Sequence, residues 1–305
     1  MFNFVQYYLN TMESYQINDL ERLTGIKAHT IRIWEKRYSL IHPNRTDTNR
    51  RYYDDAQVRK LLNVTTLLSY GHKISKIAAL TDEEIHEHIE HDSSATTGLH
   101  VNNGYVNDLL ASMLAFDEVG FERIFSAAVL RMGMFDTMVQ VVYPFLAKTG
   151  VLWTVNKSAP VQEHFASCII KRKLMAATDG LLSSTHKPKR FLLFLPPLEW
   201  HEIGLMFANY IIRSRGFQTL YFGQDLPTED VIKIVGMVAP EYILTFFVAA
   251  RPAEEVKDFI TAYATAEPRA HVVVAGSLDL LSTSQTNLPN VSYMKGVHDL
   301  LDLLK

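Results

Sequence analysis

The sequence is poor in the features that mark secreted, disulfide-bonded and membrane-spanning proteins. It contains one cysteine, Cys168, which excludes an intramolecular disulfide or a cysteine-based zinc site. Because Cys168 lies in an apolar helical stretch, we expect it to be a small buried residue. No apolar run approaches the ~18 residues that cross a bilayer, and the N-terminus lacks the pattern of a secretory signal. These absences predict a cytoplasmic protein without a membrane partner.

The chain also has little excess of charge of either sign. Its 30 basic and 33 acidic residues give a net charge of −3, and 48% of the 305 residues are hydrophobic, which is typical of a globular protein. The length allows two or three domains. The charge is unevenly distributed, because residues 24–52 hold seven lysines and arginines against two acidic residues. This local surplus predicts a polyanionic partner for that segment.

Residues 13–80 show short helical patterns broken by turn signals. In the first, Asn18 has the position of a helix cap with Glu21 at the capping-box spacing, and Gly25 ends the helix. The second, residues 28–38, directs Ile31 and Trp34 toward a core. The opposite face of this second helix carries polar and basic side chains, namely His29, Arg32 and Lys36.

The pattern then changes from helix to hairpin and back to helix. Residues 42–49 indicate a hairpin loop, and residues 51–53 a returning strand. Asp54 or Asp55 begins a longer helix whose apolar positions are Val58, Leu61, Leu62, Val64 and Leu68.

The middle of the chain predicts a linker followed by a helical bundle. Residues 81–104 are polar and read as a linker, and residues 105–186 hold four helical stretches. Breaks near Phe116, Gly133 and residues 153–158 favour an antiparallel four-helix bundle. Pro144 falls inside the third helix and is expected to kink it.

From residue 187 to the C-terminus the periodicity is that of strands alternating with helices. The apolar runs cover residues 191–195, 219–222, 242–248, 271–275 and 291–294. Five strands spaced by helices predict a doubly wound five-stranded parallel sheet, with ligands at the carboxyl ends of the strands. The expected fold class is therefore multidomain, α and α/β.

The N-terminal motifs resemble the winged helix-turn-helix domain of the MerR family of regulators. The resemblance is carried by residues 31–38, Pro43 and residues 49–52, in that order. It implies binding to double-stranded operator DNA by a helix in the major groove and a wing on the backbone. It assigns base or groove contacts to His29, Thr30 and Arg32, and mainly phosphate contacts to Lys36, Arg50, Arg51 and Tyr52.

A second motif, Glu199-x-His201-x-x-Gly204, follows the first predicted strand. It resembles the flavodoxin-like cobalamin-binding domain of methionine synthase, the mutases and the CarH/LitR light-responsive repressors. The resemblance implies that His201 ligates cobalt and that Glu199 orients the imidazole. It also implies that Gly204 lets the nucleotide tail of the cofactor pass.

Two later segments match the same family with departures. Residues 245–247 and 275–276 correspond to its Ser-x-Leu and glycine-pair elements. Thr245 keeps the hydroxyl that would bond the buried base, and Gly276 keeps one glycine, whereas Phe247 and Ala275 depart from the pattern.

In the bundle, Trp153 is followed after nine residues by Glu163 and His164. This spacing resembles the signature of cobalamin-dependent photoreceptor regulators and implies a cap over the upper face of adenosylcobalamin. Some relatives have a histidine after the tryptophan, where this chain has Thr154. A proline at position 160 suits the first turn of the next helix.

These resemblances predict a non-enzymatic repressor, a homo-oligomer (dimer or tetramer) whose DNA binding depends on adenosylcobalamin and light. One alternative is a regulator of the same fold that senses cobalamin level or a partner protein. A cobalamin-dependent methyltransferase component is the alternative from the enzyme class.

Overall fold

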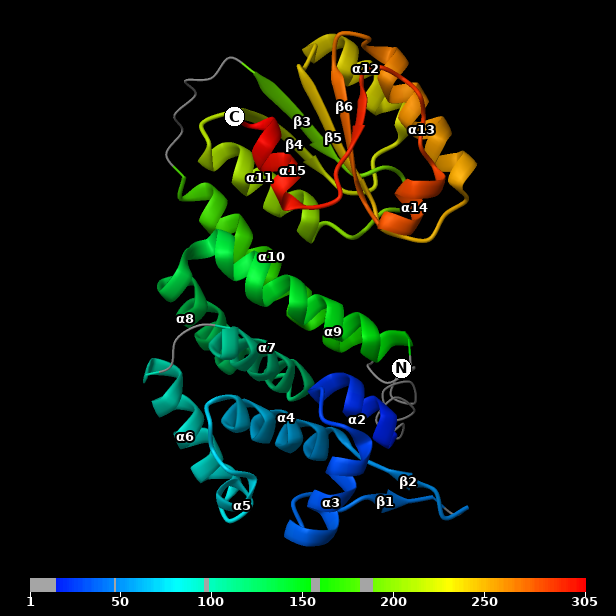
Figure 1. Ribbon diagram of the computed structural model, residues 1–305. Helices are drawn as coiled ribbons and strands as arrows, with labels where there is room; N and C mark the ends of the chain where they lie inside the picture. Colours follow the sequence, from blue (N-terminus) through cyan, green and yellow to red (C-terminus); the bar gives the residue numbers. More distant parts are fainter. Residues whose placement is uncertain (1–14, 47, 96–98, 155–159, 182–188) are drawn as a thin grey trace, which may run out of the picture. The chain divides into compact units, whose positions relative to one another are not determined.

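The computed structural model describes residues 15–46, 48–95, 99–154, 160–181 and 189–305 (Figure 1). The chain divides into two compact units, Met1–Ile169 and Ile170–Lys305. Over its described residues the first unit is helical apart from one small hairpin, and the second is an α/β unit built on a parallel sheet. This is the multidomain α and α/β class that the sequence predicts.

The described part of the first unit starts with two short helices and a hairpin. These are α2 (Ile17–Thr24), α3 (Ala28–Tyr38), and the antiparallel strands β1 (Asn44–Arg45) and β2 (Arg51–Tyr52). They are followed by α4 (Asp55–Ser69) and α5 (Ile74–Ile77). The predicted helix 28–38 is confirmed at both ends, and Ile31 and Trp34 are buried about one turn apart on its inner face, as predicted.

Two local predictions are wrong. Gln16, and not Asn18, precedes the first turn of α2, and its backbone N–H donates to Asp19, which takes the third helical position. Glu21 instead turns toward α3. The expected loop 42–49 contains β1, because Asn44 pairs with Tyr52 across the hairpin. The end of α2 at Gly25, with φ +74°, and the cap of α4 by Asp54 are confirmed.

The segment 81–104, expected to be a linker, is largely helical. α6 spans Asp82–Ala95, and α7 (Leu99–Leu114) begins before the segment ends. The cause is a capping box, in which the Thr81 hydroxyl accepts from the Glu84 N–H and the Thr81 N–H donates to the Glu84 carboxylate. Ile85 and Ile89 are then buried four residues apart on one face of α6.

The bundle helices after α7 are α8 (Glu118–Thr137), α9 (Tyr143–Thr154) and α10 (Pro160–Asp179). Gly133 has φ +81° and interrupts α8, as the sequence predicts. The irregularity expected at Pro144 takes the form of a π-helical turn, η1 (Met138–Val142), just before it. Cys168 is exposed on α10, contrary to expectation, because it lies off the face that buries Ala166 and Ile169.

The structure contains a long apolar helical segment that the sequence did not predict. By length and composition, the helical segment Glu118–Gly150 is apolar enough to cross a membrane, although no such run was expected. Length and composition alone are weak support for a membrane span, because core helices meet the same criteria. The segment is also interrupted by the non-helical Gly133.

The second unit contains five parallel strands in the order β4-β3-β5-β6-β7. They are β3 (Arg190–Phe194), β4 (Gln218–Gly223), β5 (Tyr242–Phe247), β6 (His271–Gly276) and β7 (Val291–Tyr293). All five predicted strands are confirmed, with ends that differ by one residue at most. The order reverses direction between β3 and β5, and this position is where such sheets bind ligands.

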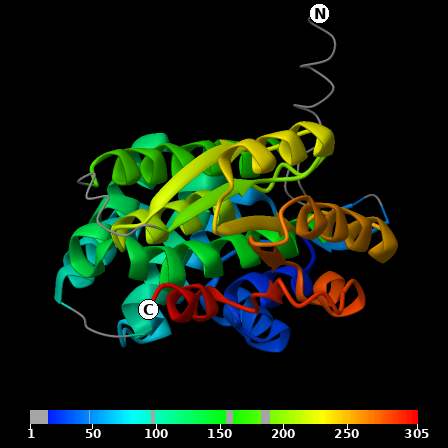
Figure 2. The ribbon, with the colours of Figure 1, turned by 90° about the horizontal axis from the view of Figure 1, so that it is seen from above.

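Helices cover both faces of this sheet. They are α11 (Ile203–Ser214), α12 (Thr228–Val238), α13 (Ala253–Ala266), α14 (Leu278–Thr283) and α15 (Val297–Leu303). Ile243 and Phe247 of β5 pack in one core with Val231 of α12 and Val256 of α13. Figure 2 shows α12 (yellow) and α15 (red) on either side of the strands. The unit is thus a doubly wound, flavodoxin-like sheet.

Candidate functional site

The exposed face of α3 carries the side chains that the sequence assigns to DNA. His29, Arg32 and Lys36 are exposed, and Thr30 is half-buried, with its hydroxyl 3.3 Å from the His29 ring. Their order along the helix places the basic groups away from the buried Trp34. The face is therefore rigidly supported and available to a groove.

The hairpin β1–β2 presents a second basic group. Arg50 and Arg51 are exposed, and Tyr52 is half-buried beside the strand. Asn49 adopts φ +62° in the turn and accepts a hydrogen bond from the Arg45 guanidinium at 2.5 Å. Arg45 is also exposed on this wing, although the sequence did not assign a DNA contact to it.

The turn between α2 and α3 is fixed by a residue whose role the sequence did not reveal. Both oxygens of the Glu21 carboxylate point forward, one accepting from the Lys27 ammonium and one from the Ala28 N–H, each at 2.9 Å. The hydrogen bond from Lys27 is the main reason that the pKa of Glu21 is lowered. This carboxylate therefore caps the N-terminus of the recognition helix.

In the second unit, Glu199 and His201 form a tight pair at the carboxyl end of β3. The imidazole Nδ1 lies 2.5 Å from Glu199 Oε1, while Oε2 accepts from the N–H groups of Val248 and Ala249 at 2.8 Å each. Glu199 is fully buried, and the His201 side chain is 52% exposed. The carboxylate anchors to the end of β5 and presents the imidazole outward.

The charge on Glu199 is maintained by its hydrogen bonds. Burial by itself raises the pKa of this carboxyl, but the bonds from His201 and from the backbone N–H groups of Ala249, Val248 and His201 hold it at about 2. A carboxylate at Nδ1 places the proton there and directs the lone pair to Nε2. The pair is thus suited to present a neutral imidazole to a metal.

Large apolar side chains lie in the loops and strand ends at the carboxyl edge of the same sheet. Leu198 and Trp200 flank Glu199 in the loop after β3, and Phe222 and Val248 lie at the ends of β4 and β5. With Leu278 after β6, all are exposed. Exposed apolar residues at the carboxyl ends of the strands favour a surface for a large, partly apolar ligand.

The other residues of the predicted cofactor site are separated by the sheet. A Cβ on Gly204 would lie 3.0 Å from the Phe246 ring, so Phe246 points toward α11. Because successive strand residues face opposite sides, Thr245 points away from α11. Thr245 is fully buried, and its hydroxyl has no partner among the described residues. The structure does not bring Gly204 and Thr245 to one face.

The fold itself requires a glycine at position 276. Its φ is +140°, and a Cβ there would lie 1.9 Å from the Phe247 carbonyl oxygen. The two departures from the expected pattern, Phe247 and Ala275, are both buried core residues.

The residues expected above the cofactor lie on the bundle. Trp153 belongs to the last turn of α9, but its side chain is outside the described residues. In the first turn of α10, Glu163 is half-buried and His164 exposed. Since only residues 155–159 separate the two helices, both sets lie at one end of the helix pair.

Comparison with known proteins matches the two parts of the chain separately. Residues 15–84 match the MerR HTH family regulatory protein model, and residues 105–177 match the B12 binding domain model. The chain therefore combines a MerR-type DNA-binding domain with a B12-binding domain. It is 27% identical to the HTH-type transcriptional repressor CarH of Myxococcus xanthus over 268 residues, 86% of this chain and 88% of the relative.

Two further proteins are similar to large parts of the chain. The HTH-type transcriptional repressor CarA of Myxococcus xanthus is 28% identical over 243 residues, covering 79% of this chain and 78% of the relative. The monomethylamine corrinoid protein of Methanosarcina barkeri aligns with a TM-score of 0.54 at 12% identity, over 66% of this chain and 97% of that protein. The latter likeness concerns the fold alone.

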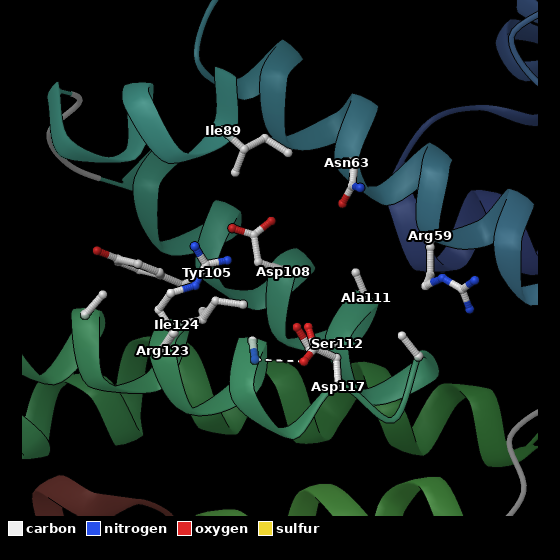
Figure 3. Close-up of a pocket in the computed structure, with 13 residues that line it drawn as sticks. Arg59, Asn63, Ile89, Tyr105, Asp108, Ala111, Ser112, Asp117, Arg123 and Ile124 are labelled. Atoms are coloured by element: carbon white, nitrogen blue, oxygen red, sulfur yellow. Dashed lines mark hydrogen bonds between the residues drawn. The ribbon is translucent and has the colours of Figure 1, made fainter. Parts of the chain in front are cut away.

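A cavity of about 360 Å³ lies between the MerR-type domain and the B12-binding domain (Figure 3). Arg59 and Asn63 of α4 line one side, and Asp108 of α7 and Arg123 of α8 another. Burial raises the pKa of Asp108 to about 7, against weaker opposing effects of the Thr66 hydroxyl and of Arg123. This carboxyl titrates near neutrality at the boundary of the two domains.

The helices α4 and α7 approach closely at Gly104. A Cβ on Gly104 would lie 2.5 Å from the Tyr70 hydroxyl oxygen and 3.5 Å from the Thr66 methyl group. The glycine on α7 thus accommodates the C-terminal end of α4.

Proposed function

We propose that the protein is a transcriptional repressor that binds double-stranded operator DNA under the control of bound adenosylcobalamin. The observation that carries the proposal is the Glu199–His201 pair at the switch point of a flavodoxin-like sheet, in one chain with a MerR-type domain. Both CarH and CarA are transcriptional repressors by name, which supports the same role here. A cytoplasmic, non-enzymatic regulator is the corresponding expectation.

The residues around His201 fit a cobalamin. His201 Nε2 would ligate cobalt while Glu199 holds Nδ1, and the apolar rim of Leu198, Trp200 and Phe222 would contact the corrin ring. The buried Thr245 hydroxyl supplies a hydrogen-bonding group that the protein itself leaves unused among the described residues. We assign Gly204 to the passage of the nucleotide tail, and we include Gly276 in the cofactor site because it matches the glycine pair of the family.

In the helical unit, Trp153, Glu163 and His164 would enclose the upper ligand of the cofactor. A bound adenosylcobalamin would supply a cobalt–carbon bond that light can cleave. The protein would then couple the upper ligand to assembly, because a ligand shifts an equilibrium only by binding one state more tightly. We propose a dimer or tetramer in darkness that dissociates on illumination and releases DNA.

For DNA, we assign base or groove contacts to His29, Thr30 and Arg32 on α3. Lys36 and the wing residues Arg50, Arg51 and Tyr52 would bind phosphates. The exposure of the basic residues supports this division.

The test is titration of the full chain with adenosyl-, methyl- and hydroxocobalamin in darkness, followed by absorption spectra, light scattering and DNA affinity. We expect His201→Ala to lose the imidazole-ligated spectrum and to weaken binding by about 10-fold or more. His298→Ala, an exposed histidine on α15, is the matched control. We expect Trp153→Ala to abolish the preference for the adenosyl form.

An oligomer that forms equally without cofactor, or that ignores the upper ligand and light, would favour the second candidate. That candidate is a regulator that senses cobalamin level or a partner protein, and the Thr154 departure is the observation that favours it. A methyltransferase component is disfavoured by the MerR-type domain. If the protein bound no DNA duplex, a methyltransferase component would become the favoured alternative.

A further inference from the structure

The loop that carries His201 is held from both neighbouring strands. We call residues 196–201 the histidine loop. On the β4 side, the Leu198 N–H donates to Asp225 Oδ1 at 2.7 Å. On the β5 side, Glu199 accepts from the N–H groups of Val248 and Ala249. The position of the imidazole therefore depends on the segments that follow β4 and β5.

A third attachment comes from Arg251, which lies between β5 and α13. Its side chain is only 6% exposed, and Nη2 donates to the Pro197 carbonyl oxygen at 2.7 Å. Nη1 donates to Glu255 Oε1 at 3.2 Å, and the guanidinium lies 6.0 Å from the centre of the Phe259 ring. Arginine is seldom buried without such partners. The buried guanidinium is thus oriented by α13 and directed at the histidine loop.

The histidine loop needs such a contact because its own sequence provides little restraint. Pro196 and Pro197 have no N–H with which to join a ladder, and Leu198 adopts φ +59°, a conformation that costs energy in a non-glycine residue. Leu198 and Trp200 are exposed, so burial contributes little to their order. A charge-assisted hydrogen bond is roughly twice as strong as a neutral one.

We infer that Arg251 is a positioning residue, which holds the Pro197 carbonyl so that His201 already faces its ligand in the free protein. The inference rests on the proposed function, in which that ligand is the cobalt of a cobalamin. Arg251 does not touch the cofactor in this scheme. It lowers the cost of ordering the histidine loop when the cofactor binds.

The experiment compares Arg251→Met, which keeps the length but removes every donor, with Arg251→Lys and with Glu255→Gln. The last variant weakens the other end of the ion pair and leaves the Pro197 contact in place. The first readout is amide hydrogen exchange of residues 198–202 in the cofactor-free full chain. We expect exchange to accelerate about 10- to 100-fold in Arg251→Met, to a smaller extent in Arg251→Lys, and hardly at all in Glu255→Gln.

The second readout is the absorption spectrum during titration with hydroxocobalamin. We expect Arg251→Met to bind about 10-fold more weakly, with a smaller imidazole-ligated fraction, and Arg251→Lys to recover part of both. Slow hydrogen exchange in peptides from β6 shows that the second unit of each variant still folds.

Each outcome decides the matter. Unchanged exchange in Arg251→Met overturns the inference, as does faster exchange with an unchanged spectrum and affinity, since Arg251 would then be merely structural. If the parent shows no cobalt–imidazole spectrum, the proposed function fails. In that case the exchange readout alone decides whether Arg251 holds the histidine loop.

Discussion

Replacement of Glu199 by glutamine should destabilise the second unit in a way that depends on pH. The pKa of Glu199 falls from 4.5 to about 2 on folding. This difference corresponds to about 3 kcal/mol of stabilisation. Because the folded-state pKa is depressed, that stabilisation is fully present above pH 4.5 and is lost as pH falls toward 2. Glutamine has the same shape and no charge at any pH.

We therefore expect Glu199→Gln to be about 3 kcal/mol less stable than the parent at pH 7, and nearly equal to it near pH 2. The assay is urea unfolding of the full chain at pH 7, 4 and 2.5, followed by hydrogen exchange in peptides from β3 and β5. Glu254→Gln, an exposed carboxylate at the start of α13, should stay within about 0.5 kcal/mol of the parent at pH 7. An equal deficit at all three pH values would refute the reasoning, because packing would then be responsible.

Three further changes test other parts of the molecule. The double variant Arg50→Ala, Arg51→Ala should weaken binding to all duplexes alike and flatten the slope of log affinity against log salt by about one per lost phosphate contact. Arg32→Ala should instead relax the preference for one DNA sequence, and fluorescence anisotropy with different duplexes checks both expectations. Asp108→Asn should gain up to about 4 kcal/mol above pH 7 and nothing below pH 4 in denaturant unfolding, because the pKa of Asp108 is raised from 3.8 to about 7 and its charge therefore opposes folding. Gly276→Ala should cost at least about 2 kcal/mol in thermal unfolding, since its Cβ would meet the Phe247 backbone, while Gly236→Ala in α12 should stabilise slightly.

The predictions that succeed are those in which one local pattern determines the outcome. The strand ends are correct because buried runs such as residues 191–195 stop where Pro196 and Pro197 begin. The inner face of α3 follows from the helical spacing of Ile31 and Trp34. The pairing of Glu199 with His201, two residues apart in one loop, was also accessible to sequence reasoning.

The predictions that fail, and the residues that were missed, depend on partners distant in sequence or on competition between caps. Asn18 has the composition of a cap, but Asp19 bonds back to Gln16 and starts the helix earlier. Arg251 is 54 residues from Pro197, so no local spacing identifies it. Thr245 and Gly204 were both assigned to the cofactor site, but the pleat of β5 turns Phe246 toward Gly204 and Thr245 to the other face of the sheet.

The close approach of α4 to α7 at Gly104 bears on which spacings between DNA half-sites the protein would accept. A DNA-binding domain attached by a flexible linker tolerates half-sites at many separations, whereas a DNA-binding domain packed against a neighbouring helix does not. In an assembly of such chains, the distance and helical phase between two α3 helices would be dictated by the bundles. Insertion of about five base pairs between half-sites, half a turn of the duplex, would turn the second site to the far side of the DNA and out of reach.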